Sequence, residues 1–510
     1  MSFDSGGFAP LSNGSSAPLD SLPLLDADAF AGSIKEAVAS GLRICSLFAA
    51  LPRRGGGTEL FVILADDGRN KLLAARAEVV ESSFPSIASA CPQAQLFERE
   101  IAEQFGLLPA GHPWLKPVRY HASWTALDAW GRDPAQAILP GVGDFYRVEG
   151  EEVHEVAVGP VHAGVIEPGH FRFQCHGERV YHLEIALGFQ HRGIERALIG
   201  GPSKLSLHYA ETAAGDSTVA HTGAYCRVLE ALGRGKSAVR ADALRGIALE
   251  LERLANHVGD IGAIAGDTGY LPTSSFCGRI RGDILNMTAL LSGNRFGRAF
   301  VVPGGVGFDA DEALSAELLR RLKVAEREVS DAVGLLWETS SVMARLENIG
   351  TLPAKVAEEL GIVGPAARAS GLQRDLRYDQ SYGIFRFSQM PVSTYDSCDV
   401  FARAFVRSLE IKQSFAFVRE LLENLPGGEV RAPLSALAPS SLAVALEEGW
   451  RGEVCHAAIT DEEGRFARYK IVDPSFHNWP ALAYVLRGEE ISDFPLCNKS
   501  FNLSYCGHDL

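Results

Sequence analysis

Four long stretches in the middle of the chain carry apolar residues at intervals of three and four. They cover residues 220–232, 241–263, 278–291 and 313–344. This spacing is typical of helices that bury one face against neighbouring helices. The last stretch is long enough to form one helix of a bundle. The chain is therefore expected to fold around a mainly helical core.

Shorter segments on the N-terminal side of this core indicate strands. A helical pattern over residues 29–41 is followed by apolar runs at residues 44–48 and 59–64, with Gly-rich or Asp-Gly turns between them. Short apolar runs bounded by such turns are typical of strands. We therefore predict an α+β domain over residues 26–121.

A second group of strand patterns flanks the helical core. Alternating apolar positions at residues 153–165 and 171–187 are broken by two Gly-containing turns and predict a β-hairpin sheet. Residues 450–470 predict another hairpin that turns at residues 461–464, and a further helix is expected to begin near Asp473.

These patterns give a fold class and four segments. The fold class is α+β, with an N-terminal α+β domain followed by a mainly helical domain flanked by β-hairpins. Residues 1–25, rich in Ser, Gly, Pro and Ala, are expected to be a flexible tail. Residues 122–150, which carry several Gly and Pro, are expected to be a linker, and residues 151–510 the second domain.

The charge of the chain argues against one class of partner. The formal net charge is −15, and Lys and Arg do not cluster in any run. Nucleic-acid binding needs clustered cations to neutralise phosphates. Nucleic acid is therefore not an expected partner.

Location and redox environment follow from two further features. No stretch reaches the roughly 18–20 uninterrupted apolar residues of a membrane span, and no secretory leader pattern opens the chain. The nine cysteines are odd in number and scattered, which favours a reducing compartment over a disulfide framework. We expect a cytoplasmic chain whose cysteines are mostly buried apolar side chains.

Several motifs occur in a fixed order along the chain, and together they resemble one family. They are Phe97–Pro113, Gly159-Pro-Val-His162 with Gly169-His170, His191-Arg-Gly-Ile-Glu195, Leu249–Gly262, Gly293–Arg298, Pro303–Gly305, Gly364–Arg377 and Tyr395–Asp399. The first is similar to the small peripheral subunit of respiratory complex I. The others are similar to the large core subunit of complex I and to the large subunit of group 4 NiFe hydrogenases of the hydrogenase-4 and formate hydrogenlyase type.

Two segments resemble the places where such hydrogenases carry their Cys-x-x-Cys pairs, residues 211–221 and 500–510. Aligned on this family, the four ligand positions fall on Ala214, Ser217, Ser504 and Gly507. A nickel–iron centre requires four thiolates, because soft sulfur ligands hold these metals. We therefore expect that this chain binds no metal there. Cys497, Cys506 and His508 lie nearby, but their spacing fits no standard metal site.

The resemblance to complex I implies a quinone site instead. A histidine of the Gly-Pro-x-His hairpin faces the quinone headgroup in that family, and His170 is the nearer equivalent here, with His162 second. A tyrosine that bonds the quinone carbonyl in complex I aligns with Gly215. Glu211 and Asp216 add carboxylates, which either handle protons or cap the helix that begins near Asp216.

The predicted site combines these residues. His170, Glu211 and Asp216 are the candidate catalytic residues. The candidate cofactor-binding residues are His162, His191, Arg192, Glu195, Gly215, Ser217, Ser504 and Tyr505. The resemblance places Arg192 and Glu195 near an iron–sulfur cluster of an adjoining subunit. The simpler interpretations are half-buried strand histidines with hydrogen-bond partners, and a local ion pair between Arg192 and Glu195.

The resemblance implies an oxidoreductase subunit of a complex-I-like assembly that takes part in NAD- and quinone-linked electron transport. The expected partners are a small iron–sulfur subunit, ferredoxin-like electron carriers and antiporter-like membrane subunits. These would hold the chain peripherally at the inner face of the cell membrane. Two other classes stay open: a redox-inert scaffold that couples a partner to ion translocation, and a metalloenzyme with an unconventional site.

Overall fold

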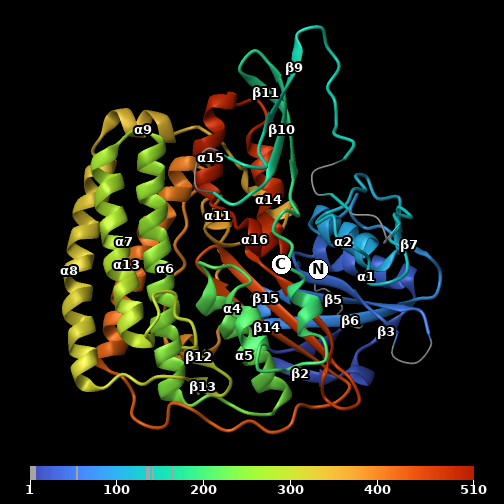
Figure 1. The fold of residues 1–510 in the computed structure, drawn as a ribbon, viewed down its shortest axis with the longest axis horizontal. Helices are drawn as coiled ribbons and strands as arrows, with labels where there is room; N and C mark the ends of the chain where they lie inside the picture. The colour runs from blue at the N-terminus through green and yellow to red at the C-terminus, as the bar shows by residue number, and fades with distance from the viewer. Residues whose placement is uncertain (1–6, 53–55, 134–137, 140–142, 163–165) are drawn as a thin grey trace.

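The computed structural model describes the chain except residues 1–6, 53–55, 134–137, 140–142 and 163–165 (Figure 1). The N-terminal part is built on an antiparallel sheet in the order β1 (Ala9–Leu11), β6 (Lys71–Val79), β5 (Thr58–Asp66) and β4 (Arg43–Ala50). The short strand β3 (Leu24–Leu25) runs parallel to β6. Helix α1 (Ala27–Ala39) begins at Asp26, whose carboxylate accepts the Ala29 N–H at 2.7 Å.

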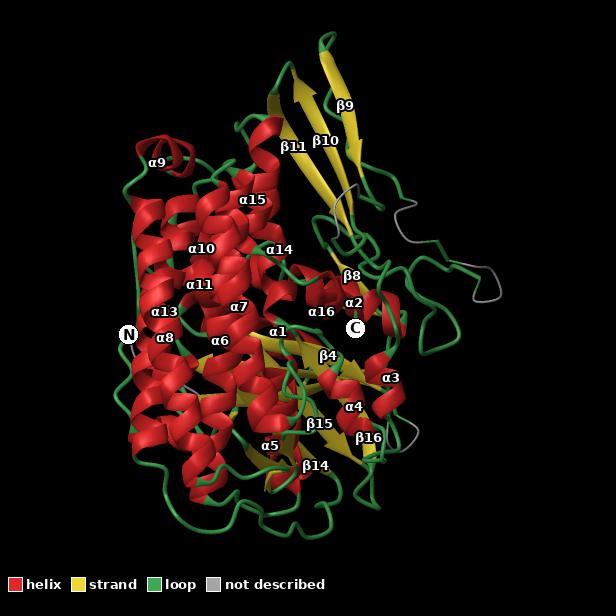
Figure 2. Cartoon of the chain, turned by 60° about the vertical axis from the view of Figure 1, so that its left-hand side comes forward, coloured by secondary structure: helices red, strands yellow, loops and turns green. Residues whose placement is uncertain are grey.

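The second part combines a sheet with a bundle of helices. The sheet has the order β16 (Phe466–Val472), β15 (Gly452–Thr460), β14 (Ser441–Gly449) and β2 (Ser15–Pro18), and α5 (Thr218–Leu232) packs on it. The bundle consists of α6 (Val239–Asp267), α7 (Leu271–Ser292), α8 (Glu312–Trp337) and α13 (Val400–Glu423), which stand side by side in Figure 2. A third sheet, β9 (Val153–Val158), β10 (His170–His176) and β11 (Arg179–Ala186), projects from one end (Figure 1).

Shorter elements connect these parts. They are β7 (Ser83–Pro85), α2 (Gln95–Phe105), β8 (Leu108–Ala110), α3 (Ile194–Leu198), α4 (Ser206–Glu211), β12 (Val301–Val302), β13 (Gly305–Val306), α9 (Ser340–Leu346), α10 (Ala354–Glu359), α11 (Gly364–Arg368), α12 (Leu376–Asp379), α14 (Pro474–Val485), α15 (Phe494–Phe501) and α16 (Tyr505–Asp509). The mixture of helices and small, mostly antiparallel sheets confirms the α+β class. No described helix is long and apolar enough to cross a membrane.

The predicted helix over residues 313–344 is in fact two helices. Helix α8 ends at Trp337, and Thr339 has an extended backbone before α9 begins. The Thr339 hydroxyl donates to the carbonyl of Leu335 at 2.8 Å. That carbonyl would otherwise accept the Thr339 N–H of a continuing helix, so the side chain competes with helix propagation.

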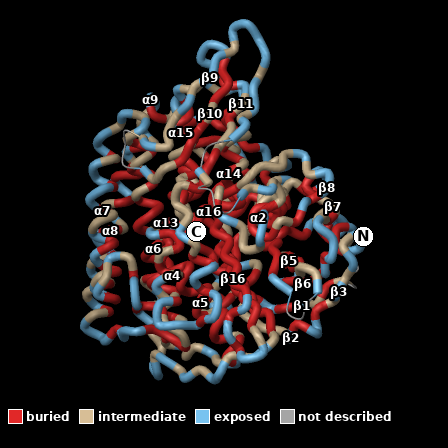
Figure 3. The backbone as a smooth tube through the Cα atoms, turned by 45° about the vertical axis from the view of Figure 1, so that its right-hand side comes forward, coloured by how far each residue is buried: buried red, intermediate tan, exposed pale blue. Residues whose placement is uncertain are grey.

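One hydrophobic core extends through both parts of the chain. It contains Phe48 and Ile63 of the N-terminal sheet together with Leu446 and Ile471 of the later one. Figure 3 shows buried backbone from β5 across β16 to the region around α14. The two predicted domains therefore share their interior.

The expectation of a flexible tail over residues 1–25 is wrong for residues 7–25. Strand β1 pairs with β6, and β2 pairs with β14 at the edge of the second sheet. Asn13 is buried between them and bonds the backbone of Leu446 on both sides, through its Nδ2 at 3.0 Å and its Oδ1 at 2.8 Å. These bonds order a segment whose composition alone suggested mobility.

Replacing Asn13 with alanine should lower the free energy of unfolding by about 3 kcal/mol, because the Leu446 N–H and the Gln380 carbonyl lose their bonds to Asn13, while the Leu446 carbonyl keeps its bond from Arg227. Denaturant unfolding would measure the change. The matched control is Ser12→Ala at the exposed neighbouring position, which should be nearly neutral. An equal, small effect at both positions would contradict an integral role for this segment.

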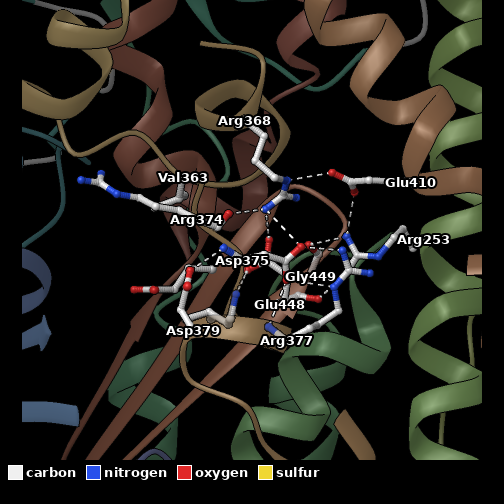
Figure 4. Close-up of polar contacts among 12 residues, drawn as sticks. Arg253, Val363, Arg368, Arg374, Asp375, Arg377, Asp379, Glu410, Glu448 and Gly449 are labelled. Atoms are coloured by element: carbon white, nitrogen blue, oxygen red, sulfur yellow. Dashed lines mark hydrogen bonds and ion pairs between the residues drawn. The ribbon is translucent and has the colours of Figure 1, made fainter. Parts of the chain in front are cut away.

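A cluster of buried charges joins the helical bundle to the sheet (Figure 4). Arg368 bonds Glu410 of α13 at 2.8 Å and Glu448 of β14 at 2.9 Å. Arg253 of α6 lies 3.4 Å from Glu410, and all four side chains are at most 3% exposed. Burial alone would raise the pKa of Glu410, but Arg368 and His257 outweigh it and hold the pKa well below its ordinary value.

Candidate functional site

Arg192 brings the two segments singled out in the sequence together. It follows β11 at the start of α3, and its guanidinium donates to the carbonyls of Thr212 at 2.5 Å and Ala213 at 2.9 Å. The same side chain donates to the carbonyl of Cys506 at 3.1 Å. Segments 211–221 and 500–510 therefore lie side by side. The local ion pair between Arg192 and Glu195 does not form, because Arg192 is committed to these carbonyls.

Residues 215–217 form one wall of the predicted site, and the side chain of an arginine covers it. Arg451, at the turn between β14 and β15, holds both carboxylate oxygens of Asp216 at 2.5 and 2.7 Å. It also lies 3.5 Å from the Ser217 hydroxyl. The idea that Asp216 caps the next helix is wrong, since Ser217 is the N-cap residue. Gly215 is exposed, with open space at the position of a side chain.

The opposite wall is the C-terminal helix α16. Ser504 is buried and caps this helix by accepting the Gly507 N–H at 2.9 Å. The ring of Tyr505 packs edge-on against Trp479 at 4.9 Å, and burial raises the pKa of Tyr505 to about 12. A Cβ at Gly169 would lie 2.5 Å from the Tyr505 ring, so only glycine fits at position 169.

The two hairpin histidines are fixed by backbone carbonyls. The Nδ1 of His170 lies 3.3 Å from the Gly159 carbonyl, and its Nε2 accepts from the Arg172 Nε at 3.2 Å. His162 bonds the Gly169 carbonyl at 3.0 Å. Among the described residues, no hydrogen bond or ion pair joins either histidine to segment 211–221. The part of the predicted strand at residues 163–165 lies outside the described residues.

His191 and Glu195 occupy the base of α3. His191 bonds the Asp509 carbonyl at 2.8 Å and stacks on His121, and burial lowers its pKa to about 4. Glu195 is buried between Arg468 at 2.9 Å and Lys470 at 3.1 Å. Burial lowers the pKa of Lys470 to about 7, although Glu195 acts to raise it.

Glu211 faces away from Asp216. One carboxylate oxygen accepts the Ala299 N–H at 2.5 Å, and the other bonds His208 at 2.9 Å. The structure therefore brings together only some of the residues of the predicted site. Arg192, residues 215–217 and residues 504–505 are neighbours, whereas Glu211 and His170 are bonded elsewhere.

A buried chain of hydrogen bonds beside Gly507 was not foreseen from the sequence. The Asp473 carboxylate bonds the Nε2 of His221 at 3.0 Å, and the Nδ1 of His221 lies 3.1 Å from the Nε2 of His456. The Nδ1 of His456 then bonds the Tyr469 hydroxyl at 2.9 Å. All four side chains are 0% exposed. We name this chain the Asp473–Tyr469 relay.

The charge states of its members follow from their surroundings. Burial acts to raise the pKa of Asp473, but the hydrogen bond from His221 and the charge of Arg451 outweigh it and lower the pKa. Burial lowers the pKa of His456 well below its ordinary value and raises that of Tyr469. His221 donates to the ionised Asp473, and the neutral His456 donates to His221 while it accepts from Tyr469. Every polar atom in the relay then has a partner.

The relay ends at one of the four aligned ligand positions. A Cβ at Gly507 would lie 2.6 Å from a carboxylate oxygen of Asp473. The space that a residue 507 side chain would take is therefore filled by this carboxylate. Ala214 offers no donor, and the Ser504 hydroxyl is used in its cap. Among the described residues, no group of three or more His, Cys, Asp or Glu is placed to hold a metal ion. These residues do not fit a nickel–iron centre.

Glu252 of α6 supplies a titratable group at the start of α5. It accepts the Val219 N–H at 2.7 Å and the Ala220 N–H at 3.3 Å, in place of a capping side chain. Burial raises the pKa of Glu252 to about 8, and the nearby charge of Asp216 acts in the same direction. Glu252 therefore holds a proton at neutral pH.

Between pH 4.5 and 8 the folded chain keeps a proton on Glu252 that the unfolded chain has released. Stability contributed by this group is complete below pH 4.5 and is lost as the pH rises to 8. Relative to wild type, Glu252→Gln should therefore become more stable by about 2–5 kcal/mol over this interval. Urea unfolding at pH 5 and at pH 8.5 would measure this change, with exposed Glu429→Gln as the control. A difference that does not vary with pH would contradict the shifted pKa.

Comparisons with known proteins match this architecture. Residues 27–131 match the family model of the respiratory-chain NADH dehydrogenase 30 Kd subunit, and residues 267–443 match that of the 49 Kd subunit. The chain belongs to the family of complex I 49 Kd subunits and complex-I-like hydrogenase subunits, with a 30 Kd-type domain fused ahead. This confirms the resemblance seen in the motifs.

Individual relatives are similar over most of the chain. Formate hydrogenlyase subunit 5 of Escherichia coli strain K12 is 28% identical over 466 residues, which cover 87% of this chain and 80% of the relative. The carbon monoxide-induced hydrogenase of Rhodospirillum rubrum is 30% identical over 350 residues, or 68% and 97%. NADH-quinone oxidoreductase subunit 4 of Thermus thermophilus is 28% identical over 369 residues, or 67% and 90%.

Proposed function

We propose that this chain is the core subunit of a membrane-associated, complex-I-like oxidoreductase that has lost the nickel–iron site and reduces a quinone-type or other small acceptor. The observation that carries the proposal is the Asp473–Tyr469 relay, which ends beside Gly507. Buried histidines, a carboxylate and a phenol joined in one line are a path for protons to a reaction that consumes them.

The proposed reduction of the acceptor requires electrons from a partner subunit. Reduction of a quinone to a hydroquinone takes two electrons and two protons. The electrons would come from an iron–sulfur cluster on a small partner subunit. Ferredoxin-like carriers or another donor would reduce this cluster again after each transfer. One proton would pass from His221 to the Asp473 carboxylate and on to the acceptor. His456 would then pass a proton to His221 and Tyr469 one to His456, and the Tyr469 phenolate would be reprotonated from solvent. A second proton is available at Glu252, next to the Asp216 wall.

The family supports the setting of this reaction. Relatives are named as subunits of formate hydrogenlyase, of a membrane-bound hydrogenase and of NADH-quinone oxidoreductase. We infer that antiporter-like membrane subunits hold this chain at the inner face of the cell membrane. In this setting Arg192 holds segments 211–221 and 500–510 together. After the exposed sheet of β9, β10 and β11 docks on the partner subunits, His170 and His162 of the hairpin face the acceptor.

A second candidate is a redox-inert scaffold that couples an iron–sulfur partner to membrane subunits. The closure of Asp216 by Arg451 favours it, because a bidentate ion pair occupies both carboxylate oxygens. The two candidates differ in whether the complex turns over an acceptor through this chain.

The test uses the whole complex, purified through a tag on this chain. Reduced methyl viologen would be the donor and decylubiquinone the acceptor. His221→Gln should lower turnover at least tenfold with assembly intact, while the exposed Glu429→Gln, outside the hairpin sheet, leaves it unchanged. Full turnover in His221→Gln would favour the scaffold. Stoichiometric nickel in the purified complex would overturn the loss of the metal site.

A further inference from the structure

The junction between the two parts of the chain contains a cavity of about 490 Å³. Its walls are α2, the segment at residues 114–120, β11, α10 and α14. Helix α14 and strand β11 pack against each other, as Figure 1 shows. Cavities of this size at domain junctions are typical of small-molecule sites.

The cavity adjoins the site described above at α16, since His508 of that helix lines it. Residues 192, 215–217, 504 and 505 do not line it, and Trp479, whose ring packs on Tyr505, stands between them and the cavity. Most of the remaining lining is apolar. Leu183 and Leu187 are buried in it, and Ile185 and Leu360 are half-buried.

Within the described part of the chain, two cations of the lining form no ion pair, the exposed Arg487 and the half-buried Arg99. Arg99 of α2 donates its Nε to the Lys116 carbonyl at 2.7 Å and one Nη to the Pro117 carbonyl at 2.9 Å. Among the described residues it forms no ion pair, and burial lowers its pKa. The neighbouring Lys116 is neutralised by Glu184 at 2.7 Å. Arg99 therefore leaves a positive charge in a largely apolar cavity.

Two buried polar atoms of the lining also lack partners within the described part of the chain. They are the indole N–H of Trp479, a side chain only 3% exposed, and the Nε2 of His182. A buried polar atom without a hydrogen bond costs about 1–3 kcal/mol, so such atoms mark places where a further group binds. Burial keeps His182 neutral by lowering its pKa.

We propose that this cavity binds a small anionic amphiphile, an aromatic or aliphatic carboxylate with a single negative charge. Its carboxylate pairs with Arg99, and its apolar body lies along Leu183, Ile185 and Trp479. A neutral molecule of the same shape would leave the Arg99 charge unpaired, so the site discriminates by charge. The occupant is distinct from the acceptor of the proposed reaction, and its binding requires no turnover.

Isothermal titration calorimetry of the full chain with 2-naphthoate tests the proposal. One equivalent should bind, and the uncharged 2-naphthamide, which has the same shape, should bind at least tenfold more weakly. Ala483→Phe adds a ring on the α14 wall and should weaken 2-naphthoate at least tenfold. Val356→Trp, on the facing α10 wall, should do the same and serves if the first variant does not fold.

The variant Arg99→Gln tests the effect of the Arg99 charge separately from the effect of the ligand's shape. This variant should bind 2-naphthoate and 2-naphthamide with equal affinity, while exposed Arg279→Gln keeps the wild-type preference. The proposal is overturned if the wild-type chain does not bind 2-naphthoate at about 1 mM, or if it binds both probes with equal affinity. It is also overturned if Ala483→Phe and Val356→Trp bind 2-naphthoate as tightly as the wild type. Loss of the viologen-to-quinone activity without loss of naphthoate binding would bear on the proposed function alone.

Discussion

Replacing Arg368 with methionine is expected to lower the free energy of unfolding by about 3–5 kcal/mol. Methionine has a similar length and fills the same space, so packing is largely kept. The loss arises because Glu410 keeps its buried charge, and the Glu448 carboxyl, whose pKa burial raises, stays buried, both without their shared cation. Chemical denaturation followed by tryptophan fluorescence would measure it.

The matched control is Arg279→Met. Arg279 also pairs with two carboxylates, Asp283 and Glu328, both at 2.8 Å, but its side chain is 49% exposed. Water can take the place of this exposed guanidinium at little cost, so the free energy of unfolding should fall by less than about 1 kcal/mol. If the two variants lose the same stability, the buried cluster does not hold the bundle to the sheet.

Replacing Asp473 with asparagine is expected to reverse the direction of the Asp473–Tyr469 relay. The asparagine oxygen can still accept the Ser475 N–H, so its NH₂ group faces His221. His221 must then accept at Nε2 and donate from Nδ1, and His456 must donate to Tyr469. Nitrogen NMR of ¹⁵N-histidine-labelled chain would show the exchanged tautomers.

The same substitution should lower viologen-to-quinone turnover of the complex by about 100-fold, because the amide introduced at this position delivers no proton. Asp461→Asn, in the exposed turn between β15 and β16, changes the same group without touching the relay and should have no effect. Reversed tautomers together with unchanged turnover would show that the relay is structural.

Much of the fold could be predicted from local patterns. The four helical stretches and the β-hairpins were found because apolar periodicity reports which face of an element is buried. The motif order also predicted the family. The end of α8 was missed, since a single threonine hydroxyl decides it and leaves the apolar pattern intact.

The candidate site could be predicted only in part. Sequence reasoning found that segments 211–221 and 500–510 belong together, but Asp473 and His221 stand 252 positions apart and His221 and His456 stand 235 apart. Periodicity shows that these residues are buried, and it does not show which strand lies under which helix. A polar residue at an inward position of a strand, such as His456, was the available signal.

Strand β2 sits at the edge of a sheet whose other strands come from the end of the chain. Asn13 bonds Leu446 across 433 positions of sequence. During synthesis β2 must therefore wait for its partner until residues 441–449 of β14 have left the ribosome. A nascent chain stopped before β14 would lack this contact, so residues 13–18 should stay open to proteases until β14 has been made.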